Sequence, residues 1–245
     1  MAEAGPAEAR HPECGGIAAQ QGPRNPSGGP PGDGRRFEAG RPAVISFGYP
    51  RRWLAETGST NDVAREWALA GAPDGAVVVA ARQTSGRGRR ERKWDSPADA
   101  GLYASFILRP DWPAARAPDL AILAGMAAFH ALEKAGVGDL RVKWPNDLLA
   151  HGKKICGVLV EPRLGAGRIE FAVAGIGINV GQGPDGFPPE LRATATSCRN
   201  EGVAISVDRM SEGLIESFPV VRQMPFAALR AEWLAAGAKE EEPEL

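Results

Sequence analysis

The sequence predicts an α+β fold in which a mixed β-sheet is backed by helices. Short apolar runs typical of strands occur among segments with helical periodicity, and the two kinds of segment do not alternate strictly. Two of the apolar runs, at residues 155–160 and 169–180, are joined by a glycine-rich turn at 164–167, which indicates a hairpin. Hairpin pairs of this kind favour a mixed sheet over a doubly wound parallel sheet.

The first helix is expected at residues 61–70. Ser59 or Thr60 can cap its N-terminus, and Gly71 supplies a residue at which the helix can stop. Two apolar runs typical of strands come next, at residues 77–81 and 102–108.

A second helix is expected at residues 118–135, because this stretch is rich in leucine, alanine and methionine. Pro118 suits the first turn of a helix, and Gly136 ends the pattern. The remaining elements are a strand at 141–144, the two hairpin strands, and two helices at 208–218 and 226–236.

The composition is that of a soluble globular protein with no bias toward nucleic acid or membrane. Of the 245 residues, 43% are hydrophobic and 24% are charged, and the net charge is −1 at pH 7. No global basic field would therefore recruit DNA or an anionic membrane, and no apolar run reaches the roughly 20 residues of a membrane span. No secretory signal is visible, so a cytoplasmic location is expected.

Cysteine and histidine are too scattered for a disulfide framework or for a metal site built into the protein. The residues concerned are Cys14, Cys156, Cys198, His11, His130 and His151.

Three segments are expected along the chain. Residues 1–42 are dense in glycine, proline, alanine and arginine, which predicts a disordered tail that cannot form a DNA-binding helix-turn-helix. Residues 43–237 are expected to form one folded domain. Residues 238–245 are expected to be an acidic, frayed tail.

A basic, glycine-containing loop is expected between Arg82 and Trp94. Gly86 and Gly88 interrupt regular structure and leave backbone amides exposed. Arginine forks bind phosphate or carboxylate oxygens, so the loop is a candidate anion site, although a solvated basic loop explains the composition equally well. A DNA-contacting loop is a further alternative, which the near-neutral net charge disfavours. The cations are Arg82, Arg87, Arg89, Arg90, Arg92 and Lys93.

The segment VKWPND, at residues 142–147, places a cation, an amide and a carboxylate after a predicted strand. Lys143, Asn146 and Asp147 could hold a nucleotide with its Mg²⁺, since this hard cation takes carboxylate and phosphate oxygens together. The alternative is that Pro145 and its neighbours form an ordinary turn.

Two further segments carry unusual residues in predicted strands. Lys154 begins an otherwise apolar strand, where it could be desolvated against a ligand or simply be an exposed lysine at the strand end. Gly175 and Gly177 would weaken the next strand unless something approaches the backbone closely, and Asn179 falls on the same side. The glycine spacing fits neither a dinucleotide fingerprint nor a P-loop.

Taken in order, these motifs closely resemble the catalytic domain of biotin–protein ligases, also called biotin–acetyl-CoA-carboxylase ligases, over residues 45–236. The resemblance is to the monofunctional type, which lacks the DNA-binding domain. It implies a fold like that of class II aminoacyl-tRNA synthetases and biotin ligase catalytic domains. The motifs are GSTN at 58–61, GRGRR at 86–90, KWPND at 143–147, KKICGVLVE at 153–161 and GIGIN at 175–179.

The resemblance also implies a role for each motif residue. Lys154 and Arg89 would be catalytic, at the biotin carboxylate and the α-phosphate. Residues implied to bind biotin are Ser59, Thr60, Asn61, Gln83, Arg87, Gly88, Arg89, Lys154, Gly157 and Gly175. Residues implied to surround ATP and Mg²⁺ are Trp94, Asn146, Asp147 and Asn179.

The activity that the resemblance implies is ATP-dependent ligation of biotin to a lysine of a biotin carboxyl carrier domain, through biotinyl-5′-AMP. ATP, Mg²⁺ and biotin are the implied co-substrates, a carboxylase carrier domain is the implied partner, and a homodimer is left open. Two alternatives remain: a lipoate or octanoate ligase or transferase of the same fold, and a binding module that retains biotin without transferring it.

The sequence departs from the family pattern at two places that bear on activity. Glu91 stands where the family usually has glycine, and could pair with Arg89 or Arg90. The family's C-terminal barrel, which resembles an SH3 domain, is expected to be absent because the chain ends shortly after Trp233.

Overall fold

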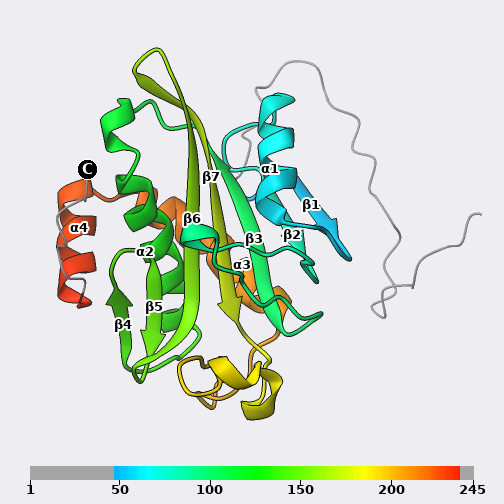
Figure 1. Ribbon diagram of the computed structural model, residues 1–245. Coiled ribbons are helices and arrows are strands. Elements are labelled where there is room, and N and C mark those ends of the chain that lie inside the picture. The colour runs from blue at the N-terminus through cyan, green and yellow to red at the C-terminus, as the bar shows by residue number, and fades with distance from the viewer. Residues whose placement is uncertain (1–46, 238–245) are drawn as a thin grey trace, which may run out of the picture. The chain divides into compact units, whose positions relative to one another are not determined.

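A computed structural model describes residues 47–237, and these form a seven-stranded mixed sheet with helices on both faces (Figure 1). The strand order is β1-β2-β3-β7-β6-β5-β4, with β1 parallel to β2 and every other neighbouring pair antiparallel. The strands are β1 (Arg51–Leu54), β2 (Val77–Ala80), β3 (Gly101–Leu108), β4 (Leu140–Lys143), β5 (Asp147–Ala150), β6 (Lys153–Gly165) and β7 (Arg168–Asn179). The α-helices are α1 (Thr60–Leu69), α2 (Asp119–Lys134), α3 (Val207–Gln223) and α4 (Phe226–Ala235).

Successive residues of the central strands pack against different helices, because side chains alternate across a sheet. Val77, Val79 and Phe106 belong to the main core with α2, α3 and α4. Val78 and Ile107 pack instead in a smaller core with α1. The α1 helix therefore covers one face of the sheet and the other three helices cover the opposite face.

The predicted strand and helix order is confirmed, including the β6–β7 hairpin, whose turn contains Gly167 at φ +75°. Two short strands, β1 and β5, were not predicted. Each is only four residues long, and β1 carries the exposed Trp53, so neither shows a clear apolar pattern.

Two helix ends differ from the expectation. Ser59 is the N-cap residue of α1, but its side chain makes no capping hydrogen bond. The helix α3 was expected to end at Phe218, yet it continues through Pro219 to Gln223. Burial of Val221 against the main core favours this last turn, despite the hydrogen bond that a proline inside a helix removes.

The tails predicted at residues 1–42 and 238–245 lie outside the described residues. Among residues 47–237, no helix is long and apolar enough to cross a membrane.

Candidate active site

The first turn of α1 carries a buried polar network against the sheet. The backbone N and the Oγ1 of Thr60 donate to Gln83 Oε1, at 2.8 and 3.0 Å. The hydroxyl of Ser105 on β3 lies 2.7 Å from Thr60 Oγ1 and 2.6 Å from Asn61 Oδ1. Ser59, Thr60 and Asn61 are all buried, and the side chains of Thr60 and Asn61 find their hydrogen-bond partners within the protein.

Two glycines on β7 explain how side chains from other elements reach the sheet. A Cβ at Gly175 would lie 2.2 Å from Asn61 Oδ1. A Cβ at Gly177 would lie 2.5 Å from Cε2 of Trp94, and a Cβ at its cross-strand partner Gly157 would lie 2.8 Å from Cζ3 of the same indole. Glycine is therefore required here because Asn61 and Trp94 pack directly onto the strand backbone.

An ion pair lies beside Gly157 and Gly177, which are called the glycine floor below. Lys154 Nζ lies 2.7 Å from Asp147 Oδ1, and 5.2 Å from the centre of the Trp94 ring. Asp147 and Gly157 are register partners on neighbouring strands, so the sheet itself fixes the carboxylate next to the floor. Lys154, Asp147 and Trp94, called the Lys154 cluster below, thus bring a cation, a carboxylate and an aromatic ring together on the sheet.

The basic loop forms a narrow hairpin between Gly86 and Trp94. Trp94 N donates to Gly86 O at 2.9 Å, and Gly88 N donates to Arg92 O at 2.6 Å. Arg89 lies at the exposed tip, and the contacts described for residues 47–237 give it no ion-pair partner. The side chain of Glu91 lies outside the described residues, so its predicted pairing with Arg89 or Arg90 stays a prediction.

Arg87 is the loop cation that the structure places in a cluster. Its Nη1 and Nη2 donate to the two carboxylate oxygens of Asp62, at 2.6 and 2.8 Å. Nη2 also lies 3.7 Å from Oε1 of Glu161 on β6. The hydrogen bond from Arg87 lowers the pKa of Asp62, and the same contact raises the pKa of Arg87.

Asn146 and Asn179 make hydrogen bonds to the backbone near Lys154. Asn146 Nδ2 donates to Val158 O at 2.8 Å, and Asn179 Nδ2 donates to Thr196 O at 2.9 Å. Their amide donors are therefore committed to the backbone, beside the Lys154 pair.

Cys156 is a packed apolar residue, as the sequence predicts. It is completely buried, and burial raises the pKa of its thiol although nearby Lys154 opposes that shift. A neutral buried thiol is a poor nucleophile.

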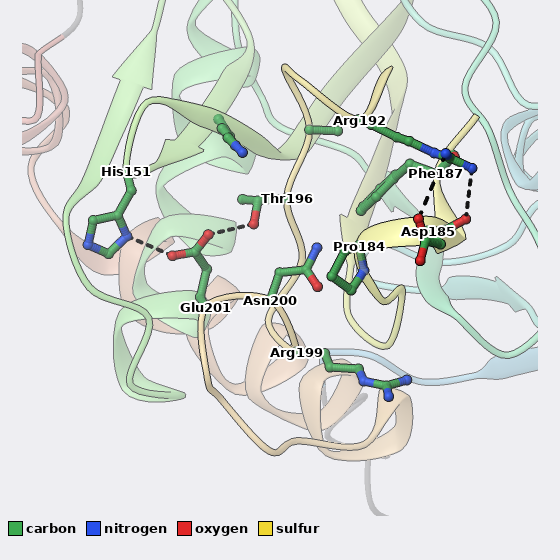
Figure 2. A pocket seen from close by; sticks show the side chains of 11 residues that line it. His151, Pro184, Asp185, Phe187, Arg192, Thr196, Arg199, Asn200 and Glu201 are labelled. Atoms are coloured by element: carbon green, nitrogen blue, oxygen red, sulfur yellow. Dashed lines mark hydrogen bonds and ion pairs between the residues drawn. The ribbon is translucent and has the colours of Figure 1, made fainter. Parts of the chain in front are cut away.

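A cavity of about 700 Å³ lies beyond the start of β6, and Lys153 is the one motif residue among those that line it (Figure 2). His151 Nδ1 lies 2.6 Å from Glu201 Oε2, and the other oxygen of Glu201 accepts from Thr196 Oγ1 at 2.5 Å. Lys154 is joined to one lining residue through its backbone, because Thr196 N donates to Lys154 O at 2.9 Å. The predicted site residues do not line this cavity.

Four polar residues in contact with the predicted site had been assigned no role from the sequence. Glu161 stands at the end of the KKICGVLVE motif, but a single carboxylate at the end of an apolar strand carried no signal. The other three lie outside the quoted motifs and contact motif residues only in the folded structure. These residues are Asp62, Ser96, Ser105 and Glu161.

Comparison with known proteins identifies relatives of this chain. Residues 53–179 match the biotin/lipoate A/B protein ligase family. The biotin–[acetyl-CoA-carboxylase] ligase of Paracoccus denitrificans is 35% identical over 198 residues, which cover 78% of this chain and 82% of that protein. The bifunctional ligase/repressor BirA of Bacillus subtilis (strain 168) is 43% identical over 151 residues, or 62% of this chain and 46% of that protein.

The chain thus spans about half the length of the BirA relatives that it matches. Among solved structures, the biotin protein ligase from Aquifex aeolicus in complex with biotin and ATP is similar, with a TM-score of 0.60 and 31% sequence identity. That similarity covers 75% of this chain and 76% of the other. The family match includes both β6 and β7, and the chain therefore belongs to the biotin/lipoate A/B protein ligase family.

Proposed function

We propose that this chain is a biotin–protein ligase, which activates biotin as biotinyl-5′-AMP with ATP and transfers it to a lysine of a biotin carboxyl carrier domain. The observation that carries the proposal is the cluster of Lys154, Asp147 and Trp94 packed on Gly157 and Gly177. A lysine and an exposed arginine loop beside an aromatic face suit a substrate with a carboxylate, a phosphate and a flat base. Residues 43–237 are the proposed catalytic unit.

The first step joins two substrates without a protein nucleophile. An oxygen of the biotin carboxylate attacks the α-phosphorus of ATP, the bond from the α-phosphorus to the bridging oxygen breaks, and pyrophosphate leaves. We expect Lys154 to stabilise the negative charge on the reacting oxygens. Arg89 would join it when the hairpin tip bends toward Lys154. Catalysis then consists of positioning and charge stabilisation.

The second step is an acyl transfer to the carrier. The neutral amine of the carrier lysine attacks the carbonyl carbon of the mixed anhydride, and AMP leaves with the electron pair of the broken C–O bond. The amine proton is released to solvent. Cys156 takes no part, since its thiol is buried and neutral.

The buried polar network at the start of α1 supports biotin over lipoate or octanoate. Thr60, Asn61 and Gln83 offer hydrogen-bonding groups close to the floor, and the ureido ring of biotin has both donors and a strong acceptor. These groups already bond to one another and to Ser96, Ser105 and Glu161, and the ureido ring can join that network, whereas a dithiolane or an alkyl chain offers it no strong donor or acceptor. The names of the relatives, which specify biotin, point the same way.

Magnesium would enter with ATP and would not be held by the protein alone. Within the described residues there is no group of three or more histidine, cysteine, aspartate or glutamate side chains suited to a metal. The single carboxylate of Asp147 fits a cation that takes most of its ligands from phosphates and water. When bound, Mg²⁺ would neutralise charge on the phosphates, while Lys154 and Asp147 orient the reacting groups.

The deciding experiment incubates the full chain with radiolabelled biotin, MgATP and a purified biotin carboxyl carrier domain. The proposal expects label on the carrier and release of both pyrophosphate and AMP. Label retained on the ligase as adenylate, without transfer, would favour a binding module instead. Transfer of lipoate or octanoate in preference to biotin would place the chain in the other branch of the family.

A further inference from the structure

Three consecutive residues in the first turn of α1 contact three different parts of the site. Thr60 donates to Gln83 at the base of the loop, Asn61 Nδ2 donates to Glu161 Oε2 on β6 at 2.7 Å, and Asp62 accepts both hydrogen bonds from Arg87. Glu161 faces Asn61 with one carboxylate oxygen and Arg87 with the other. The helix, the loop and the strand thereby meet through four connected side chains.

Arg87 joins the hairpin of residues 86–94 to two elements outside it. The hairpin is closed by its own backbone bonds at Gly86–Trp94 and Gly88–Arg92, and Trp94 at its base packs on Gly157 and Gly177. Bidentate arginine–carboxylate pairs have a fixed geometry and are stronger than single contacts between exposed charges. The pair is also only about one-third exposed on each side, which limits competition from water.

Both terminal nitrogens of Arg87 are committed to carboxylates of the protein. A substrate carboxylate could take them only by breaking the pair with Asp62. Arg89 and Lys154 are better placed to meet substrate oxygens. The described residues give Arg89 no ion-pair partner, and the ammonium of Lys154 lies over the ring of Trp94. Arg87 therefore acts on the hairpin more readily than on the substrate.

We propose that Asp62 and Glu161 are positioning residues that, through Arg87, hold the 86–94 hairpin against α1 and β6 at the biotin subsite. The inference rests on the proposed function, because it concerns the biotin end of the site. The 86–94 hairpin would form a wall there that is in place before biotin binds. Glu161 links that wall to Asn61, so the hairpin and the amide expected to face biotin are fixed together. A preformed wall lowers the ordering cost of binding.

The test compares Asp62→Asn with Arg65→Gln by hydrogen–deuterium exchange of the ligand-free chain. Arg65 Nη2 contacts Asp62 Oδ1 at 3.1 Å from the exposed side of the helix, so Arg65→Gln removes a charge partner of Asp62 without touching Arg87. In Asp62→Asn, amides of residues 86–93 should exchange up to about fivefold faster, the effect of losing a partly exposed charged pair. Arg65→Gln should exchange at the wild-type rate, and Asp62→Glu should recover most of the protection.

Steady-state kinetics supply the second readout. Asp62→Asn should raise KM for biotin by up to about fivefold and change kcat less than twofold, because the fraction of chains with the wall in place falls while the reacting groups stay intact. Unchanged exchange in Asp62→Asn, or equal acceleration in Arg65→Gln, would overturn the inference. If exchange responds as expected but no form of the chain binds biotin, the wall stands and the proposed function fails.

Discussion

Lys154 Nζ lies 2.7 Å from Asp147 Oδ1, across two neighbouring strands of the sheet. The carboxylate oxygen is buried, and the ammonium meets it as an ion pair without the direction of a good hydrogen bond. The ammonium therefore keeps donors to offer a ligand, while Asp147 sets its position on the glycine floor.

Lys154→Ala should reduce adenylate formation by about 30- to 1,000-fold, corresponding to roughly 2–4 kcal/mol of lost charge stabilisation. The measurement is pyrophosphate release from biotin and MgATP under saturating conditions. Lys153→Ala is the matched control, because Lys153 is the exposed neighbour on the same strand. Wild-type pyrophosphate release by Lys154→Ala would remove Lys154 from the mechanism, provided that circular dichroism shows both variants folded.

Gly177→Ala should weaken binding of biotin and ATP by about tenfold or more. The added Cβ would lie 2.5 Å from the Trp94 indole, so the ring must leave the floor or the strand must shift, at about 1–3 kcal/mol. Isothermal titration measures the affinities. Gly213→Ala in α3 is the control, since a Cβ there meets nothing within 4 Å and should slightly stabilise the helix. Unchanged affinity in Gly177→Ala would show that the packing of Trp94 on Gly177 does not contribute to binding.

The sequence predicted the central elements of the fold because their apolar patterns are long. Every residue of β3 is buried, and α2 carries a continuous apolar stretch, so tertiary contacts agree with local preference. The short edge strand β1 could not be found, because its side chains are partly or fully exposed and it pairs on one side only. The helix α3 was predicted to end at Phe218, because the burial of Val221 that favours its last turn is a tertiary effect.

The motif residues were found because they lie in short segments, but their contacts join segments far apart. Gly175 and Gly177 predicted a close approach to β7, yet the sequence could not say that Asn61 and Trp94 make it. Glu161 and Asn61 are 100 residues apart and meet only because β6 lies beside β7, against which α1 packs. Local patterns therefore located the site, and only the sheet register assembled it.

Arg89→Gly should leave some adenylation but let biotinyl-adenylate escape. Arg89 sits at the exposed tip of a hairpin flanked by glycine, from which it can close over the intermediate and exclude water. Free adenylate would then acylate exposed lysines of unrelated proteins. The measurement is labelling of a bystander protein by variant and wild type at equal total adenylate, and an unchanged yield would mean that Arg89 is only a solvated loop cation.

The thiols of Cys156 and Cys198 should be unreactive in the folded protein at pH 8. Burial raises the pKa of both thiols, that of Cys198 to about 12, so almost no thiolate exists at this pH. In a Cys14→Ser background, a chromogenic disulfide should titrate both buried thiols in denaturant and almost none without it. Rapid reaction of either thiol in the native protein would indicate that the β6 end of the sheet opens.

The Asp62–Arg87 pair should contribute stability that depends on pH in one direction. The pKa of Asp62 in the folded chain lies below its ordinary value of 3.8, so the contribution is fully present above pH 3.8 and is lost as pH falls through the lower folded value. Asp62→Asn should thus unfold more easily than wild type at pH 7, by about 1 kcal/mol or less given the partial exposure of both side chains. The difference should shrink below about pH 4, where Asp62 begins to bind its proton. Urea denaturation of both proteins at pH 7, 5, 4 and 3 measures it, and subtraction cancels the other titrating groups. A difference that grows toward acid pH would contradict an ionised Asp62 held by Arg87.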